Sequence, residues 1–331
     1  MKFLKVLLLL IGLFFTVYFI GPAPSAPAYA ETLEKIPSDF DSLENYIRLQ
    51  ESMHKIKPDN EARIVWNNDS SHQKTEYAIV YLHGFSASQQ EGFPVHRDIA
   101  KKFGCNLYLS RLSDHGIDTT DPMLNFTVDN YWNSAKEALS IGSKLGNKVI
   151  LMGCSTGGTL ALMLAASYPQ LVDGLVLLSP NIAINEQNAF ILNNHWGLQM
   201  ARWVKGGNSV YSTDQRPEYK KYWYSNYRLE AAVQLQELLE TKMNKATFES
   251  VKAPVLLLYY FKDQSHQDPV VKVSAMLSMF VELGSEIKEK QALPETGDHV
   301  IASYLKSNDI GGVEHSIADF LQNKMGLVPA H

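Results

Sequence analysis

One serine in this chain lies in a sequence pattern suited to covalent chemistry. Residues 153–157 read Gly-Cys-Ser-Thr-Gly and match G-x-S-x-G, in which the serine sits on a sharp turn between a strand and a helix. The apolar residues 149–152 predict the strand, and the Ala- and Leu-rich residues 156–166 predict the helix. Because glycines relieve the crowding around such a strained turn, we predict that Ser155 is a nucleophile at its apex.

A serine hydroxyl is a weak nucleophile, so it needs a base and an acid that orients this base. Where such a turn carries the serine, the acid and then a histidine follow it along the chain. Among the ten histidines, His299 lies between the last predicted strand and the last predicted helix, so we predict that it is the base. Asp263 and Asp268 both follow the strand predicted to end at Tyr260. We favour Asp268, which directly precedes Pro-Val-Val and a helix, and keep Asp263 as the alternative acid.

Negative charge that develops on a reacting oxygen requires backbone N–H donors close to the serine. We predict that one donor is the N–H of Thr156, at the start of a helix whose dipole also favours an anion. The second predicted donor is the N–H of Phe85, in the loop His-Gly-Phe-Ser that follows the apolar run ending at Leu82. His83, which precedes a glycine in this loop, is expected to have an orienting or structural role.

The composition argues against several other kinds of site. His266 lies between Asp263 and Asp268, but this loop lacks the ligand spacing of a metal site, and we expect neither a metal nor a cofactor. A net charge of −5 and a pI near 6.1 lack the basic signature of nucleic-acid binding. The two cysteines, Cys105 and Cys154, fall in predicted buried strands, so we expect no disulfide framework.

Strands and helices are predicted to alternate along most of the chain. The predicted strands are residues 63–66, 77–82, 106–111, 148–152, 175–178, 254–260 and 286–291. The predicted helices are residues 38–55, 130–145, 156–168, 271–283 and 312–324. Because most of these strands are nearly continuous apolar runs, we predict an α/β fold with a mostly parallel, doubly wound sheet and helices on both faces.

Residues 181–251 interrupt this alternation. They contain no good strand, are rich in Tyr and Trp, and include a predicted helix at about 229–243. A structureless loop of this length is implausible in a compact domain. We therefore predict a helical insertion that sits as a cap over one edge of the sheet.

The first 30 residues differ from the rest of the chain. Lys2 and Lys5 precede an uncharged apolar run at 6–20, and a Pro- and Ala-rich stretch at 21–30 ends in Ala-Tyr-Ala. The segment is predicted to be a signal peptide cleaved after Ala30, or an uncleaved membrane anchor followed by a stiff stalk. In either case residues 31–331 form the functional domain outside the cytoplasm, secreted, periplasmic or anchored to the membrane.

Several of these motifs together resemble a known family. The matching pieces are Leu82-His-Gly-Phe85, Arg111-Leu-Ser-Asp-His-Gly116, residues 149–158, Ala166-Ser-Tyr-Pro169 with residues 175–180, Asp268-Pro-Val-Val271 and Gly297-Asp-His299. Over residues 75–325 the chain resembles α/β-hydrolases of the bacterial carboxylesterase and monoacylglycerol lipase type, also grouped with serine aminopeptidase-like hydrolases. The resemblance implies the α/β-hydrolase fold with a helical cap. It also implies an acyl-enzyme on Ser155, with His299 moving the proton and Asp268 orienting His299.

These features lead us to expect a serine hydrolase that cleaves carboxylic esters of small molecules. A lipase or thioesterase acting on longer acyl chains is an alternative, and so is a peptidase of the same fold. A peptidase of the aminopeptidase kind would need an acidic anchor for the substrate amine, and no residue is marked as one. A non-catalytic binding module is disfavoured because Ser155, His299 and an acid are all present.

Overall fold

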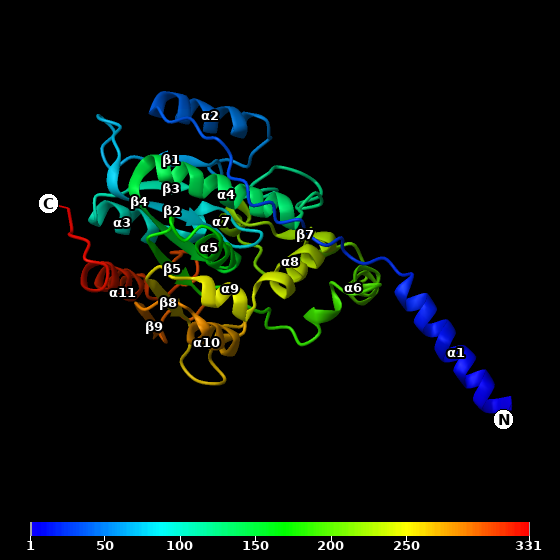
Figure 1. Cartoon of the computed structure of the whole chain (residues 1–331). Helices are drawn as coiled ribbons and strands as arrows, with labels where there is room; N and C mark the ends of the chain where they lie inside the picture. Colours follow the sequence, from blue (N-terminus) through cyan, green and yellow to red (C-terminus); the bar gives the residue numbers. More distant parts are fainter. Residues whose placement is uncertain (1, 331) are drawn as a thin grey trace.

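The computed structural model describes residues 2–330, and a seven-stranded sheet forms its centre (Figure 1). The strands follow the order β1-β3-β2-β4-β5-β8-β9, and all neighbours are parallel except β1 and β3, which pair antiparallel. They are β1 (Arg63–Val65), β2 (Thr75–Leu82), β3 (Asn106–Leu109), β4 (Gly146–Cys154), β5 (Gly174–Leu178), β8 (Val255–Tyr259) and β9 (Lys288–Ala292). This arrangement confirms the predicted mostly parallel sheet.

Helices cover both faces of the sheet, as predicted for a doubly wound fold. Residues of α4, α5, α9 and α10 share one hydrophobic cluster, and residues of α3 and α11 share the other. The helices are α1 (Lys2–Phe19), α2 (Phe40–Ser52), α3 (Val95–Lys102), α4 (Val128–Leu145), α5 (Thr156–Ser167), α6 (Gly197–Lys205), α7 (Pro217–Tyr222), α8 (Leu229–Lys242), α9 (Lys245–Ser250), α10 (Val273–Glu282) and α11 (Ile310–Asn323), with the 3-10 helices η1 (Gln89–Gly92) and η2 (Ala189–Ile191).

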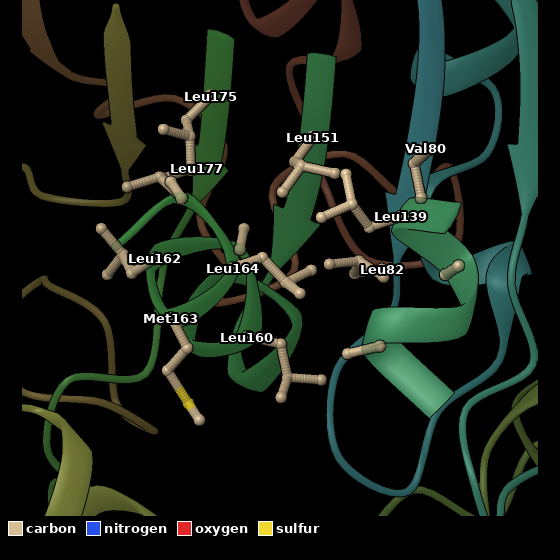
Figure 2. Packing of buried hydrophobic residues seen from close by; sticks show 14 of the residues in the cluster. Val80, Leu82, Leu139, Leu151, Leu160, Leu162, Met163, Leu164, Leu175 and Leu177 are labelled. Carbon is tan, nitrogen blue, oxygen red and sulfur yellow. The ribbon is translucent and has the colours of Figure 1, made fainter. Parts of the chain in front are cut away.

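Alternate residues of the central strands enter the two clusters, because successive side chains of a strand point to opposite faces. Val80 and Leu82 of β2 belong to the first cluster, whereas Ile79 and Tyr81 belong to the second, and all four side chains are fully buried. Figure 2 shows part of the first cluster, where leucines of β4, β5, α4 and α5 meet. Burial on both faces explains why the strands read as continuous apolar runs.

Residues 181–251, called the insertion here, connect β5 to β8 and are mostly helical. They contain η2, α6, α7, α8, α9 and a two-stranded ribbon. In the ribbon, β6 (Ser209–Tyr211) pairs antiparallel with β7 (Asn226–Arg228). The sequence showed no good strand here and did not indicate this ribbon, because strands of three residues are too short to give an alternating pattern.

The N-terminal helix α1 projects from the body of the molecule next to α6 (Figure 1), and none of its residues is buried. The following residues do not form a stalk that stands away from the fold. They run back along the body, where the N–H of Tyr29 donates to Asp129 at 2.9 Å and the Trp132 indole donates to Ala30 O at 3.0 Å. The prediction of a stalk is wrong because side chains of α4 bind this stretch of backbone.

Both cysteines of the chain, Cys105 and Cys154, are free and buried. Burial raises the pKa of the Cys105 thiol to about 12. Burial and the nearby Glu91 carboxyl raise the pKa of the Cys154 thiol well above its usual value. Both sulfurs are therefore thiols, not thiolates, at neutral pH.

Candidate active site

Ser155 lies on the turn between β4 and α5. Its backbone has φ 52° and ψ −121°, a conformation that residues other than glycine adopt rarely and at a cost in energy. The Ser155 N–H donates to Leu178 O at 2.9 Å, and Ser155 O accepts from the N–H groups of Gly158 and Asn181, both at 2.9 Å. Hydrogen bonds to β5, to the residues after it and to α5 thus hold the strained turn in place.

The two predicted oxyanion donors, Thr156 and Phe85, come from elements that approach each other closely. Gly157 permits this approach, because a Cβ atom there would collide with the carbonyl oxygen of Leu82 at the end of β2. Thr156 and Phe85 line the cavity that also contains Ser155. Within residues 2–330 no loop or cap hydrogen bond uses either backbone N–H, so both are available to a negatively charged oxygen.

His299 and Asp268 form a buried hydrogen-bonded pair. His299 Nδ1 donates to Asp268 Oδ2 at 2.6 Å, and Asp268 Oδ1 accepts from the N–H groups of Val270 and Val271 at 2.8 and 3.0 Å. His299 Nε2 is buried, and no residue between 2 and 330 hydrogen bonds to it. Burial alone would lower the pKa of His299, but the adjacent Asp268 carboxylate outweighs it, so the pKa is raised above its usual value.

Asp263, the alternative acid, lies elsewhere. Its carboxylate accepts from the N–H groups of Ser265 and His266 at 2.8 and 2.9 Å and from the His266 ring at 2.9 Å, and its side chain is 54% exposed. The structure therefore brings Asp268, and not Asp263, to His299. In the described part of the chain, no group of three or more His, Cys, Asp or Glu side chains is placed to hold a metal ion.

Ser155 and His299 line one cavity of about 510 Å³. The insertion contributes much of its aromatic wall, in which the rings of Tyr219 and Trp223 stack with their centroids 5.2 Å apart. Tyr227 packs edge-to-face on Phe85 with a centroid distance of 5.1 Å. A larger cavity of about 650 Å³ between α2 and α4 includes neither Ser155 nor His299 among its lining residues.

Glu91 also lines the cavity that contains Ser155, although no sequence motif predicted it. It lies on η1, is 2% exposed, and accepts through Oε2 from the N–H of Gly84 at 2.6 Å and from the Tyr81 hydroxyl at 3.4 Å. Burial raises the pKa of Glu91 to about 7, although the Gly84 hydrogen bond opposes this shift. In the sequence Gln-Gln-Glu-Gly reads as a polar surface turn, and only its place just after the Phe85 loop could have drawn attention to it.

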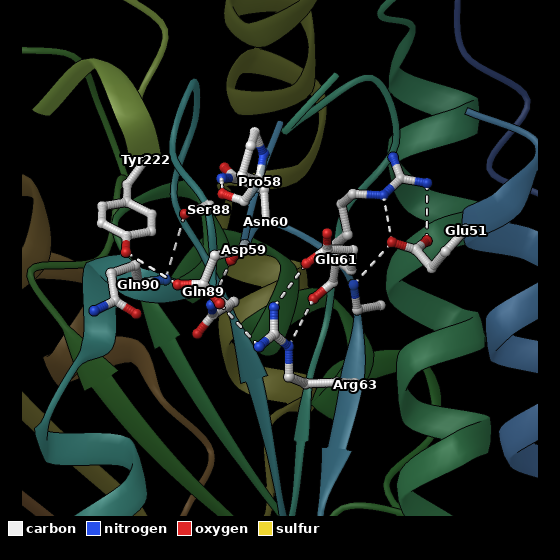
Figure 3. A network of polar contacts seen from close by, with 12 residues as sticks. Glu51, Pro58, Asp59, Asn60, Glu61, Arg63, Ser88, Gln89, Gln90 and Tyr222 are labelled. Carbon is white, nitrogen blue, oxygen red and sulfur yellow. Dashed lines mark hydrogen bonds and ion pairs between the residues drawn. The ribbon is translucent and has the colours of Figure 1, made fainter. Parts of the chain in front are cut away.

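A polar network ties η1 to the insertion (Figure 3). At its centre, the Asp59 carboxylate accepts from the Tyr222 hydroxyl at 3.0 Å and pairs with Arg63 at 2.9 Å. The backbone oxygen of Asp59 accepts from Gln89 Nε2 at 3.1 Å. Tyr222 ends α7 and Gln89 begins η1. The loop that contains Asp59 therefore fixes both the cavity wall of the insertion and the helix that carries Glu91.

His83 has the structural position expected of it. Its Nε2 accepts from the N–H of Leu112 at 3.0 Å, which leaves Nδ1 to donate to Gly84 O at 2.9 Å. Burial lowers the pKa of His83 to about 4, so the ring is neutral at physiological pH. With both nitrogens occupied by backbone groups, His83 fixes the loop that carries Phe85.

Comparison with known proteins gives relatives of several kinds. An uncharacterized protein of Mycobacterium tuberculosis is 31% identical over 102 residues, which are 31% of this chain and 28% of that protein. A thermostable monoacylglycerol lipase of Bacillus sp. (strain H-257) is 25% identical over 191 residues, 58% of this chain and 71% of that enzyme. The chain thus spans less than a third of the mycobacterial relative and most of the lipase.

Solved structures share the fold at low sequence identity. A structure from a study of two metagenome-derived lipolytic enzymes, LipS and LipT, matches with a TM-score of 0.63 and 18% identity, covering 81% of this chain and 99% of that chain. The monoacylglycerol lipase of Paleococcus ferrophilus matches with a TM-score of 0.55 and 16% identity, covering 79% and 98%. The family model described as the alpha/beta hydrolase fold matches residues 77–269, more than half of the chain. This chain belongs to the alpha/beta hydrolase fold family.

Proposed function

We propose that this protein is a serine hydrolase that cleaves carboxylic esters of small molecules through an acyl-enzyme on Ser155. The observation that carries the proposal is that Ser155, on its strained turn, shares a cavity with the buried His299–Asp268 pair. Membership of the hydrolase family supports a hydrolytic reaction, and the lipase and esterase neighbours support an ester substrate.

In the proposed reaction Ser155 Oγ attacks the ester carbonyl carbon while His299 Nε2 takes the hydroxyl proton. Asp268 holds the Nδ1–H of His299 and stabilises the imidazolium that forms, and the N–H groups of Phe85 and Thr156 bind the oxyanion. His299 then gives its proton to the departing alcohol, which leaves the acyl group on Ser155. A water molecule, deprotonated by His299, attacks this ester and releases the carboxylic acid and the free serine. Because the base must be neutral, turnover is lost as the pH falls through the pKa of His299.

Glu91 has a positioning role in this proposal. Its carboxyl holds the N–H of Gly84, and the next peptide carries the N–H of Phe85, so Glu91 fixes the direction of an oxyanion donor. Its charge also helps to raise the pKa of His299. Glu91 acts through the loop and the base and does not contact the reacting ester.

The substrate class rests on the cavity wall. Aromatic side chains of the insertion and the Phe85 ring form an apolar surface beside Ser155, which suits an acyl chain better than a charged peptide terminus. Esters of modest size are the primary substrates in this proposal. A lipase or thioesterase reaction on longer acyl chains is the alternative. Residues 1–30 are proposed to export the enzyme from the cytoplasm, as a signal peptide or a membrane anchor.

Ser155→Ala is expected to lower ester turnover by roughly 10⁵- to 10⁶-fold, because it removes the nucleophile. The circular dichroism spectrum and melting temperature should stay close to those of the wild type. Ser167→Ala, at the exposed end of α5, is the matched control and should keep full activity. Turnover that survives Ser155→Ala would exclude Ser155 as the nucleophile.

Asp268→Asn should reduce kcat by about 10⁴-fold, because the amide no longer holds His299 in the required tautomer. Asp263→Asn should change kcat by less than about twofold, since its carboxylate bonds only within its own exposed loop. Steady-state kinetics on one soluble ester measure both variants. A larger loss of kcat in Asp263→Asn than in Asp268→Asn would instead identify Asp263 as the acid.

A series of p-nitrophenyl esters of increasing acyl length tests the substrate class. We expect kcat/KM to peak at short to medium chains, because the aromatic wall encloses a cavity of limited size. A preference for the longest chains, or activation at a lipid interface, would indicate a lipase. Turnover of peptide amides without turnover of any ester would overturn the proposal.

Glu91→Ala should lower kcat by roughly 5- to 100-fold, with less effect on KM, because it leaves the buried N–H of Gly84 without an acceptor. Glu91→Gln keeps an acceptor oxygen and should retain most of kcat. Its pH–rate profile should shift to lower pH on the acidic side, because loss of the Glu91 charge lowers the pKa of His299. An acidic limb that does not move would show that His299 does not respond to this charge.

A further inference from the structure

Among residues 2–330, α1 is the one helix long and apolar enough to cross a membrane. Its mean hydropathy is 2.0 and its side chains are exposed. At 1.5 Å per residue its 18 residues extend about 27 Å, close to the thickness of a bilayer's hydrocarbon core at about 30 Å. These side chains meet no protein surface over most of the helix, so α1 requires an apolar environment outside this chain.

Residues 21–32, called the strap here, are bound to the body of the enzyme at many points. Asp129 of α4 accepts from the N–H groups of Ala28 and Tyr29 at 3.1 and 2.9 Å. The Tyr29 hydroxyl is 2.5 Å from Thr241 Oγ1 of α8, and burial raises the pKa of Tyr29 to about 12. Further hydrogen bonds to strap oxygens come from Trp132, Lys136 and Tyr168. The strap thus binds both α4, which covers one face of the sheet, and α8 of the insertion.

The junction between α1 and the strap is packed against the residues that precede α6. The N–H of Trp196 donates to Pro22 O at 2.9 Å, and its indole N–H donates to Val17 O at 3.0 Å. His195 Nδ1 is 2.6 Å from Gly21 O, and the Tyr18 ring lies edge-on to the His195 ring with a centroid distance of 5.3 Å. Because these contacts hold both sides of the junction, α1 is joined to the insertion without a free linker.

Helix α6 lies beside α1 (Figure 1), and three of its large apolar side chains are exposed. Trp203 is 85% exposed, Val204 71% and Met200 39%. Trp is enriched where membranes meet water, because its ring is apolar and its N–H is polar. Lys205, on the same helix, supplies a positive charge suited to anionic lipid headgroups.

We propose that α1 remains as a membrane anchor and that the strap holds the enzyme so that the exposed face of α6 lies on the lipid bilayer. If the anchor enters a bilayer, the junction contacts place α6 at the membrane surface. Cleavage after Ala30 would leave Asp129 and Trp196 without the strap groups that they bind. This inference rests on the proposed export of the enzyme, and it does not depend on the ester chemistry.

The test uses the full chain, purified in detergent and reconstituted into vesicles of phosphatidylcholine and phosphatidylglycerol with brominated acyl chains, which quench nearby tryptophan. The emission of Trp203 is obtained by subtracting the tryptophan fluorescence of Trp203→Phe from that of the wild type. We expect this emission to be lost in brominated vesicles and kept in unbrominated ones. The control is Val328→Trp in the Trp203→Phe background, because Val328 is 76% exposed and belongs to the segment after α11. Figure 1 shows α11 and the C-terminal end of the chain on the opposite side of the body from α1. Its added emission should not be quenched.

The intact mass of the enzyme isolated from its host membrane completes the test. A chain that begins at Glu31 would overturn the anchor. The docking of α6 would be overturned if the tryptophans at positions 203 and 328 were quenched equally. It would also be overturned if Trp203 were not quenched in a chain that resists alkaline extraction from the vesicles. If a second copy of the chain covered Trp203, the enzyme would be a dimer in nanodiscs and the Trp203 emission would not be quenched. This result would also contradict the proposal. Ester turnover in the same vesicles, with Ser155→Ala as the blank, reports separately on the proposed reaction.

Discussion

The backbone at Ser155 is held in a conformation that costs about 1–3 kcal/mol, and the rest of the cavity is arranged around it. Such a cost persists only where neighbouring structure over-determines it, and here hydrogen bonds from both sides of the turn do so. The same turn starts α5 and places Thr156 in the wall of the cavity. It also forces the close contact between Gly157 and the end of β2, which brings the Phe85 loop beside the serine. One local distortion therefore sets the positions of several functional groups.

The orientation of His299 depends on a carboxylate that cannot rotate freely. One oxygen of Asp268 faces the imidazole, and the other is bound by two N–H groups of its own loop. Rotation of the carboxylate would break all three hydrogen bonds at once in a buried site, where an unpaired group is costly. The His299 ring therefore keeps its direction through its partner's loop, and its position does not rely on the exposed segment around Asp263.

The sequence was sufficient for the features that depend on local patterns. Continuous apolar runs predicted the central strands, and the glycine-flanked serine between a strand and a helix predicted the turn at Ser155. The sequence favoured Asp268 as the acid but left Asp263 as an alternative, and only the path of the loop shows which of them meets His299. Glu91, the β6–β7 ribbon and the strap were missed or misread because each depends on burial or on contacts between distant segments. The N–H of Tyr29, for example, binds a side chain 100 residues away.

The two buried thiols bear on where such a chain can fold. A thiol whose pKa lies far above neutrality forms almost no thiolate, and the thiolate is the species that attacks disulfides and is oxidised by peroxides. Cys154 is next to Ser155 in sequence, yet alkylating reagents aimed at thiols should spare it. No cross-link has to form before the fold is complete, since both sulfurs are free. The covalent structure of the protein is therefore the same in a reducing compartment as in an oxidising one.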